Sequence, residues 1–530
     1  MQPSIKLRRP RLYQVLVCGF FILAVGVPAV QYFAQDYQKF SAMEKRALSP
    51  RPSRPSTSAE LEQFPKRFAQ YYADYFGYRE PLIRLYRRIK SALGDSPAAD
   101  VTIGKDGWLF LGSIKPGYSK YSDPIGDARH VNRYTSQQLQ DAAERFADIA
   151  YWLKEQGVEY VLLITPNKHT VYAEKLPFYI EQENVESATD QLVEYLREHT
   201  SVNVVDLRAT LIASKNEGQL YSKTDTHWNA LGANIGQQVL METLQGLFPG
   251  RVKPKRFEVI PATSSAKDLG IQVGRENVIE QDYMPVFDRD CEPVRYPKEG
   301  REKGPYTYVC EGQDLNVVVY QDSFFTALQP YFSRQIGRST YLWDNSTFKS
   351  LRNTVVNKAR DLVIEQLVER RLPYIPVENQ GFRQSPNKQY FEASQTILFD
   401  NDFSRLRYNS NLAAREMVDG ALEVSVSGDN PAIRFLRLPF RSDRKYVLRL
   451  QMTSSVDSNL VLRLSERNFD PKEPFAGYLS ERLDIKAGDN DLYIRFSHPR
   501  IGPLIRLKPL ERPGELSFHN VQIREIESRQ

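Results

Sequence analysis

Two short motifs hold the residue types that acyl-transfer chemistry needs. The first is Asp-Thr-His-Trp at 225–228, where an acid two residues before a histidine can project to the same side of an extended segment. There Asp225 could fix the tautomer of the His227 ring and stabilise its imidazolium form. The alternative is structural, with Thr224 or Asp225 capping a helix that starts near Asn229.

The second motif supplies a nucleophile. Ser323 follows an apolar run at 317–320, so it would stand exposed at the carboxyl edge of a buried parallel strand. Backbone N–H groups at the start of the next helix would then be available to an oxyanion. A simple helix cap by Asp322 or Ser323 is the alternative. The two motifs support each other, because a serine needs a base and the base needs an orienting acid.

Alternating helix and strand patterns surround both motifs and predict the elements that position them. Apolar residues at helical spacing predict helices over 64–93, 136–156, 187–197 and 229–244. Alternation or continuous apolar runs predict a hairpin over 101–112 and strands at 160–164, 202–205, 315–320 and 362–368. Together these patterns predict an α/β domain with a parallel sheet covered on both faces.

The net charge of +6 and the pI of 8.9 do not indicate nucleic-acid binding. Residues 1–35 hold four cations and no acid, and residues 400–530 carry a net charge of +2, which leaves 36–399 neutral. No basic run there could follow a phosphate backbone.

The N-terminal charge instead indicates a membrane topology. Residues 12–34 carry no charge and are long enough to span a bilayer as a helix. The basic tail at 1–11 is expected to be cytoplasmic and the rest of the chain exported. A cleaved signal peptide is the alternative, but the segment lacks a clear small-x-small cleavage site.

The cysteines agree with export. Cys291 and Cys310 lie 19 positions apart in a segment rich in proline, glycine and charge, where an oxidising compartment favours a disulfide. Two free thiols are the alternative. A metal site is not expected, because no histidine or second cysteine pair lies near.

Composition divides the rest of the chain. We expect a stalk at 35–62, a catalytic domain at 63–372 with an insertion at 251–312, and a linker at 373–395. Residues 396–530 change to a period of two, with strand-length segments between turn signals. This pattern predicts a separate all-β sandwich of the jelly-roll type.

The sequence resembles the alginate O-acetyltransferase group of SGNH-type proteins over about 101–372. The similarity lies in five segments in the same order: Gly-Lys-Asp-Gly-Trp-Leu-Phe at 104–110, the Pro-Asn-Lys region at 166–177, Asp-Thr-His-Trp at 225–228, Asp-Ser-Phe at 322–324 and the strand at 361–370. The resemblance implies Ser323 as nucleophile, His227 as base and Asp225 as orienting acid. One departure is Gln321, where the family usually has glycine.

The resemblance also implies an activity and its setting. It implies acetyl transfer to an exopolysaccharide in a bacterial periplasm, by an enzyme held in the inner membrane by a single span. No cofactor or metal is expected. The expected partners are a multipass membrane acyltransferase that supplies acetyl groups and other polysaccharide export proteins. Asn167, Lys168 and Trp228 are expected to contact the substrate.

The β-domain is expected to bind carbohydrate. Arg449, Arg463 and Arg495 fall on the outward face of predicted strands, where arginine pairs with carboxylates and stacks on sugar planes. An acidic glycan is therefore the expected ligand, and a solvated face with balancing acids is the alternative. For the whole chain, a polysaccharide esterase with the same triad and a non-catalytic polysaccharide-binding scaffold remain alternatives to the acetyltransferase.

Overall fold

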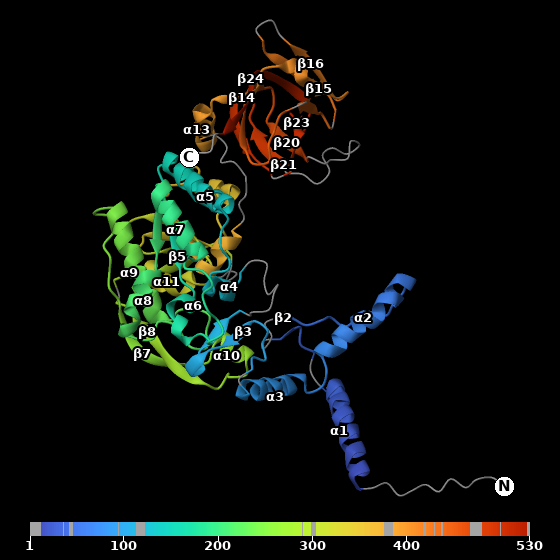
Figure 1. Cartoon of the computed structure of the whole chain (residues 1–530), viewed down its shortest axis with the longest axis vertical. Coiled ribbons are helices and arrows are strands. Elements are labelled where there is room, and N and C mark those ends of the chain that lie inside the picture. Colours follow the sequence, from blue (N-terminus) through green and yellow to red (C-terminus); the bar gives the residue numbers. More distant parts are fainter. Residues whose placement is uncertain are drawn as a thin grey trace, which may run out of the picture.

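The computed structural model contains an apolar N-terminal helix, two further helices that follow it in the chain, an α/β domain and a β-domain (Figure 1). It describes residues 12–34, 37–41, 46–93, 95–112, 122–288, 290–297, 304–375, 385–416, 420–428, 430–435, 438–466, 480–498 and 500–526.

A seven-stranded sheet forms the centre of the α/β domain, in the order β6-β5-β13-β11-β12-β10-β9. The first five strands are parallel, and β10 and β9 add an antiparallel edge. The parallel sheet expected from the apolar runs is thus confirmed. The strands are β5 (Glu159–Thr165), β6 (Asn203–Asp206), β9 (Val294–Tyr296), β10 (Tyr306–Val309), β11 (Asn316–Tyr320), β12 (Arg338–Leu342) and β13 (Leu362–Val368).

Helices cover both faces of this sheet because its strands are apolar on both sides. Leu162 and Ile164 of β5 join one core with α5 (Ser136–Glu155), α7 (Ala188–His199) and α12 (Phe348–Val355). Val161 and Leu163 join the other core with α8 (Arg208–Ala213), α9 (Ala230–Leu247) and α11 (Phe325–Phe332). The alternation of side chains along β5 therefore fixes a three-layer arrangement.

An insertion between α9 and β11 carries a two-stranded arm. Its strands β7 (Glu258–Ser265) and β8 (Ile279–Val286) pair antiparallel, and α10 (Asp268–Gln272) lies between them in the chain. A disulfide joins Cys291 and Cys310, as expected from their setting.

The β-domain is a sandwich of two antiparallel sheets, of five and six strands, around its own apolar core. One sheet has the order β16-β17-β24-β19-β22 with β14 beside β24, and the other β15-β18-β23-β20-β21. The strands are β14 (Thr396–Asp400), β15 (Leu406–Tyr408), β16 (Leu412–Glu416), β17 (Leu422–Val426), β18 (Ile433–Phe435), β19 (Lys445–Ser454), β20 (Ser458–Glu466), β21 (Ser480–Ile485), β22 (Gly488–Phe496), β23 (Ile501–Lys508) and β24 (Gly514–Ile526).

The segments expected to be a long helix, a stalk and a linker need correction. The helix predicted over 64–93 is two helices, α2 (Ser58–Asp74) and α3 (Arg79–Ala92), because the chain turns at Tyr78 with a φ of 59°. The stalk at 35–62 includes a small hairpin, β1 (Phe40–Ser41) with β2 (Arg46–Ala47), and the first turn of α2. The linker at 373–395 contains α13 (Ser385–Ala393), while 376–384 lies outside the described residues.

The N-terminal helix α1 (Leu12–Ala34) matches the charge-free segment of the sequence. Among the described residues it alone is long and apolar enough to cross a membrane, with a mean hydropathy of 2.1 over Leu12–Tyr32. An apolar N-terminal helix and a disulfide are features of an exported or membrane-anchored chain.

Candidate functional site

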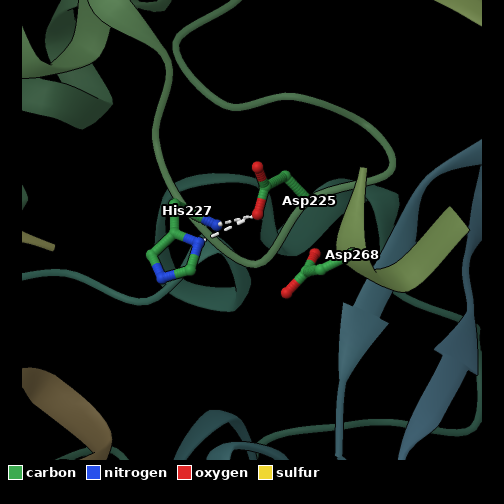
Figure 2. Close-up of side chains that lie close together, drawn as sticks. All are labelled: Asp225, His227 and Asp268. Carbon is green, nitrogen blue, oxygen red and sulfur yellow. Dashed lines mark hydrogen bonds and ion pairs between the residues drawn. The ribbon is translucent and has the colours of Figure 1, made fainter. Parts of the chain in front are cut away.

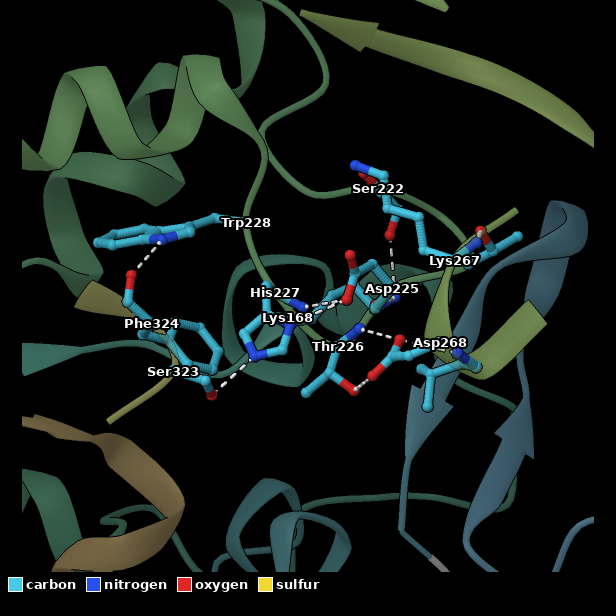
Figure 3. Close-up of polar contacts among 12 residues, drawn as sticks. Lys168, Ser222, Asp225, Thr226, His227, Trp228, Lys267, Asp268, Ser323 and Phe324 are labelled. Carbon is cyan, nitrogen blue, oxygen red and sulfur yellow. Dashed lines mark hydrogen bonds and ion pairs between the residues drawn. The ribbon is translucent and has the colours of Figure 1, made fainter. Parts of the chain in front are cut away.

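Ser323, His227 and Asp225 form one hydrogen-bonded chain at the carboxyl edge of the central sheet (Figure 3). The Ser323 hydroxyl donates to His227 Nε2 over 2.7 Å. On the other side of the ring, Nδ1–H donates to Asp225 Oδ1 over 2.9 Å, because a carboxylate can only accept. This is the arrangement in which a histidine can take a proton from a serine while an acid stabilises the resulting imidazolium.

The loop before α9 holds the histidine and its acid. Asn229 caps α9, its side chain accepting from Gly232 N, so the cap is neither Thr224 nor Asp225. The main-chain N–H of His227 also donates to Asp225 Oδ1 over 3.2 Å. The carboxylate of Asp225 is therefore left to orient the ring rather than the helix.

The turn after β11 exposes the serine. Asp322 accepts from Phe324 N and Val368 N over 2.9 Å each and fastens the turn to β13. Trp228 Nε1 donates to the carbonyl of Phe324 over 3.0 Å and joins the two loops. With the turn held by Asp322, the Ser323 side chain is free to face His227.

Gln321 fits the turn without a glycine. Its side chain is 1% exposed and accepts from Gln329 Nε2 over 2.8 Å, while its own amide donates to the Tyr306 hydroxyl. It therefore points into the core, away from the serine. The replacement of glycine at this position leaves the contact between Ser323 and His227 intact.

Asp268 of α10 forms a second carboxyl group beside Asp225 (Figure 2). Its oxygens accept from Thr226 N over 3.0 Å and from the Thr226 hydroxyl over 3.1 Å. Burial and the charge of Asp225 raise the pKa of Asp268. Burial would also raise the pKa of Asp225, but the hydrogen bonds and charge of His227 outweigh it and lower that pKa. Asp225 is therefore the more acidic of the two carboxyl groups.

The same three side chains could in principle hold a metal ion, since their ligand atoms lie within 4.8 Å of one another. Their hydrogen bonds favour another use. His227 Nδ1 already bonds Asp225, and Thr226 occupies both oxygens of Asp268. A metal ion would have to displace the contact that orients the ring towards Ser323, so the geometry fits a proton-transfer site better.

Asn167, Lys168 and Trp228, the residues expected to contact substrate, are buried within the protein. All three are at most 3% exposed. Asn167 donates to Asp127 Oδ2 over 2.6 Å and accepts from Arg370. Lys168 Nζ donates to the carbonyls of Ser222, Lys223 and Asp225. These buried side chains therefore stabilise the loops around the site from the interior of the protein.

Lys168 gives a pH-dependent prediction. Burial lowers its pKa from 10.5 to about 8, against the opposing charges of Asp225, Asp268 and Glu280. Because the unfolded chain binds more protons between pH 8 and 10.5, this lysine should make the fold more stable as pH rises through that window, by roughly 2–3 kcal/mol. The comparison of wild type with Lys168→Met at pH 7 and pH 10, by chemical unfolding, isolates this contribution.

Tryptophan fluorescence suits that measurement. All four tryptophans (108, 152, 228 and 343) lie in the α/β domain, so the β-domain contributes no tryptophan signal. A stability difference between the two proteins that stays constant with pH would contradict a lowered pKa for Lys168.

Two of the three arginines expected to face a glycan contact neighbouring protein instead: Arg495 contacts α5, and Arg449 contacts α13. Arg495 is 14% exposed and pairs with Asp148 of α5. Arg449 forms two bonds with Asp491 of about 3 Å and lies over the rings of Phe391 and Tyr493. The helices α13 and α5 cover the outward face of the sheet that contains β19 and β22. The strand pattern alone could not indicate this cover. Arg463 is exposed, on the other sheet.

Several residues of the site carried no signal in the sequence. Asp268 reaches the site from α10, which is remote in the chain, and Gln366 of β13 holds the turn through its bonds with Asp322. No local spacing connects them to the Asp-Thr-His-Trp motif.

Comparisons with known proteins find similarity to acetyltransferases over the α/β domain. Residues 101–299 match the family model described as the SGNH hydrolase-like domain of acetyltransferase AlgX. The chain is 28% identical over 247 residues to the probable alginate O-acetylase AlgJ of Pseudomonas aeruginosa, covering 44% of this chain and 55% of that protein. It spans about half the length of the curated relatives it matches.

Two solved structures are also similar. The O-acetyltransferase domain of Pseudomonas putida AlgJ is 20% identical with a TM-score of 0.34, covering 52% of this chain and 92% of that one. Pseudomonas aeruginosa AlgX is 13% identical with a TM-score of 0.37, covering 81% and 94%. In sequence, the α/β domain is therefore similar to the SGNH hydrolase-like acetyltransferases AlgX and AlgJ.

Proposed function

We propose that this chain is an O-acetyltransferase that moves acetyl groups onto hydroxyls of an exported polysaccharide. The observation that carries the proposal is the chain of bonds from Ser323 through His227 to Asp225. His227 takes the hydroxyl proton as Ser323 Oγ attacks the acetyl carbonyl, and returns it to the departing oxygen of the donor. An acetyl ester on Ser323 results.

The second half of the reaction uses the same groups in reverse. A sugar hydroxyl gives its proton to His227 and attacks the acetyl ester, and Ser323 recovers a proton as it leaves. Asp225 stabilises the imidazolium in both halves. Within the described chain the Ser323 N–H makes no hydrogen bond, which leaves it available to the oxyanion, whereas the Phe324 N–H already bonds Asp322.

An esterase is the second candidate. The His227 side chain is 29% exposed, so water could take the place of the sugar hydroxyl. Incubation with an acetyl ester donor, with and without a glycan acceptor, separates the two functions. A transferase should form acetylated glycan at the expense of free acetate, and an esterase should release acetate equally in both reactions.

The N-terminal helix supports a setting at the inner membrane. With α1 in the inner membrane and the basic tail in the cytoplasm, the α/β and β-domains lie in the periplasm. Acetyl groups made in the cytoplasm must cross that membrane, so the donor is a multipass membrane acyltransferase that works beside this chain. Other polysaccharide export proteins would deliver the acceptor.

The β-domain contributes a surface suited to an acidic glycan. Arg407, Arg434, Arg506 and Arg463 stand opposite one another on four neighbouring strands, β15, β18, β23 and β20. Their neighbours along the strands are buried, apart from Tyr408, so this arginine row lies on the outer face of the sheet. At the usual strand spacing it spans about 14 Å.

Like charges in register destabilise a sheet, so an anion bound along the row would relieve the repulsion among the four arginines. Burial, followed by the charges of Arg463 and Arg434, lowers the pKa of Arg506. A polymer with a carboxylate on each sugar would place its charges along the row and pair with successive guanidinium groups. The arginine row therefore favours an acidic polysaccharide as the acceptor.

Removing half of the row tests this. Arg463→Ser with Arg506→Ser should weaken binding of a polyuronate about tenfold or more and reduce its salt dependence, because charge pairing is screened by salt. Isothermal titration at two salt concentrations measures both effects. The control is Arg441→Ser, an exposed arginine outside the row that pairs with Asp443. Equal losses in both proteins would show that general charge, and not the row, binds the polymer.

A further inference from the structure

The helix α3 exposes an apolar stripe. Four large side chains of the helix lie along one face and are 47–55% exposed: Leu82, Leu85, Tyr86 and Ile89. Leu93, directly after the helix, continues the stripe and is 76% exposed. In a surface helix of a soluble domain such a stripe faces the core. Here it faces away from the protein.

The polar face of α3 makes the contacts with the α/β domain. Arg87 donates to the carbonyl of Ile271 over 3.3 Å, and a Cβ on Gly274 would touch the Arg87 side chain. Arg88 pairs with Glu276 over 3.7 Å. The charged side of the helix is therefore attached to the region of α10, and the apolar side is turned outward.

The start of α3 lies beside the membrane-spanning helix. Gly77, in the turn before α3, packs so tightly on Pro28 of α1 that a Cβ there would lie 1.9 Å from the Pro28 carbonyl oxygen. Tyr32 of α1 meets the rings of Tyr71 and Tyr72 at 6.4 and 5.6 Å. Figure 1 shows α3 running across the direction of α1 near the end that leads into the rest of the chain.

These contacts define how deep the start of α3 would lie in a membrane that α1 crosses. Pro28 lies six residues before the end of α1, which is roughly 9 Å along a helix. The apolar span of α1 ends at Tyr32, so the turn that begins α3 lies about 6 Å inside the level at which α1 leaves the hydrocarbon core, within the depth typical of interfacial helices. The tyrosines around it are the residues that gather at membrane interfaces.

We propose that α3 lies in the outer interface of the membrane that α1 crosses. Its apolar stripe enters the acyl chains, while Arg87 and Arg88 on the opposite face hold the α/β domain. The segment 79–90 holds five cations and one acid, a balance complementary to anionic lipid. With α1 and α3 both in the membrane, the α/β domain would stand in a fixed orientation above it.

Spin labels on the full-length protein test the proposal. The free Cys18 is first replaced by serine, and single cysteines are then placed at Leu85 and Ile89 in the stripe and at Arg84 and Arg88 on the polar face. The protein is reconstituted in nanodiscs that contain anionic lipid and no other protein. Collision with oxygen reports lipid, and collision with a water-soluble nickel complex reports water.

The expected result is a helical pattern. Labels at 85 and 89 should favour oxygen over nickel at least threefold more than labels at 84 and 88, because only one face enters the membrane. Four labels that all favour nickel would overturn the proposal and indicate that the stripe docks on a protein. The reverse pattern would overturn the orientation of the helix.

Discussion

Replacement of Ser323 with alanine should reduce acetyl transfer by at least about 10³-fold, while the protein stays folded. The hydroxyl makes one described hydrogen bond, to His227, so its removal takes away the nucleophile without opening a cavity in the core. The rate is measured by acetylation of a glycan from an acetyl ester donor. Intact-protein mass spectrometry after brief exposure to that donor should find one acetyl group on wild type and none on the variant.

The matched control is Thr326→Ala. Thr326 is an exposed hydroxyl residue on α11, three positions after Ser323, and it should retain wild-type activity and labelling. If Ser323→Ala kept full acetyl transfer, the covalent mechanism would be wrong, and the chain would act as a polysaccharide-binding scaffold.

The sequence alone located the three residues of the proton-transfer chain, because each sits in a short motif with a chemical reason for its spacing. It left open whether those motifs were helix caps. That question needed the tertiary structure: Asn229 caps α9, and Asp322 fastens the turn after β11 to β13. Local sequence proposes such a role, but only packing decides which neighbour takes it.

The wrong predictions for Arg449, Arg495 and the helix over 64–93 share a physical cause. A period of two correctly placed Arg449 and Arg495 on one face of a strand, but it could not show that α13 and α5 cover that face. Helical spacing likewise ran through Tyr78, where the close approach of Gly77 to Pro28 accompanies a turn in the chain. The periodicity of a sequence predicts the direction of a side chain, but it does not predict which part of the protein that side chain contacts.

The pair of carboxyl groups behind His227 supplies the second large prediction. Asp225→Asn should lower acetyl transfer by about 10³- to 10⁴-fold, because an amide that donates to Nδ1 holds the wrong tautomer and cannot stabilise an imidazolium. Asp268→Asn should lower it less than tenfold. Asp268 contacts Thr226 rather than the ring, and an asparagine there can still accept from one of the two Thr226 donors.

The double variant Asp225→Asn/Ser323→Ala makes the comparison sharper. If both residues act in one proton transfer, the double variant should be no slower than Ser323→Ala, since the effects of groups that act as a unit are not additive. Kinetics of the four proteins under the same conditions give the answer. If the rate loss of the double variant equalled the product of the two single losses, Asp225 would act outside the reaction of Ser323. If Asp268→Asn lost as much activity as Asp225→Asn, the two carboxyl groups would both hold His227.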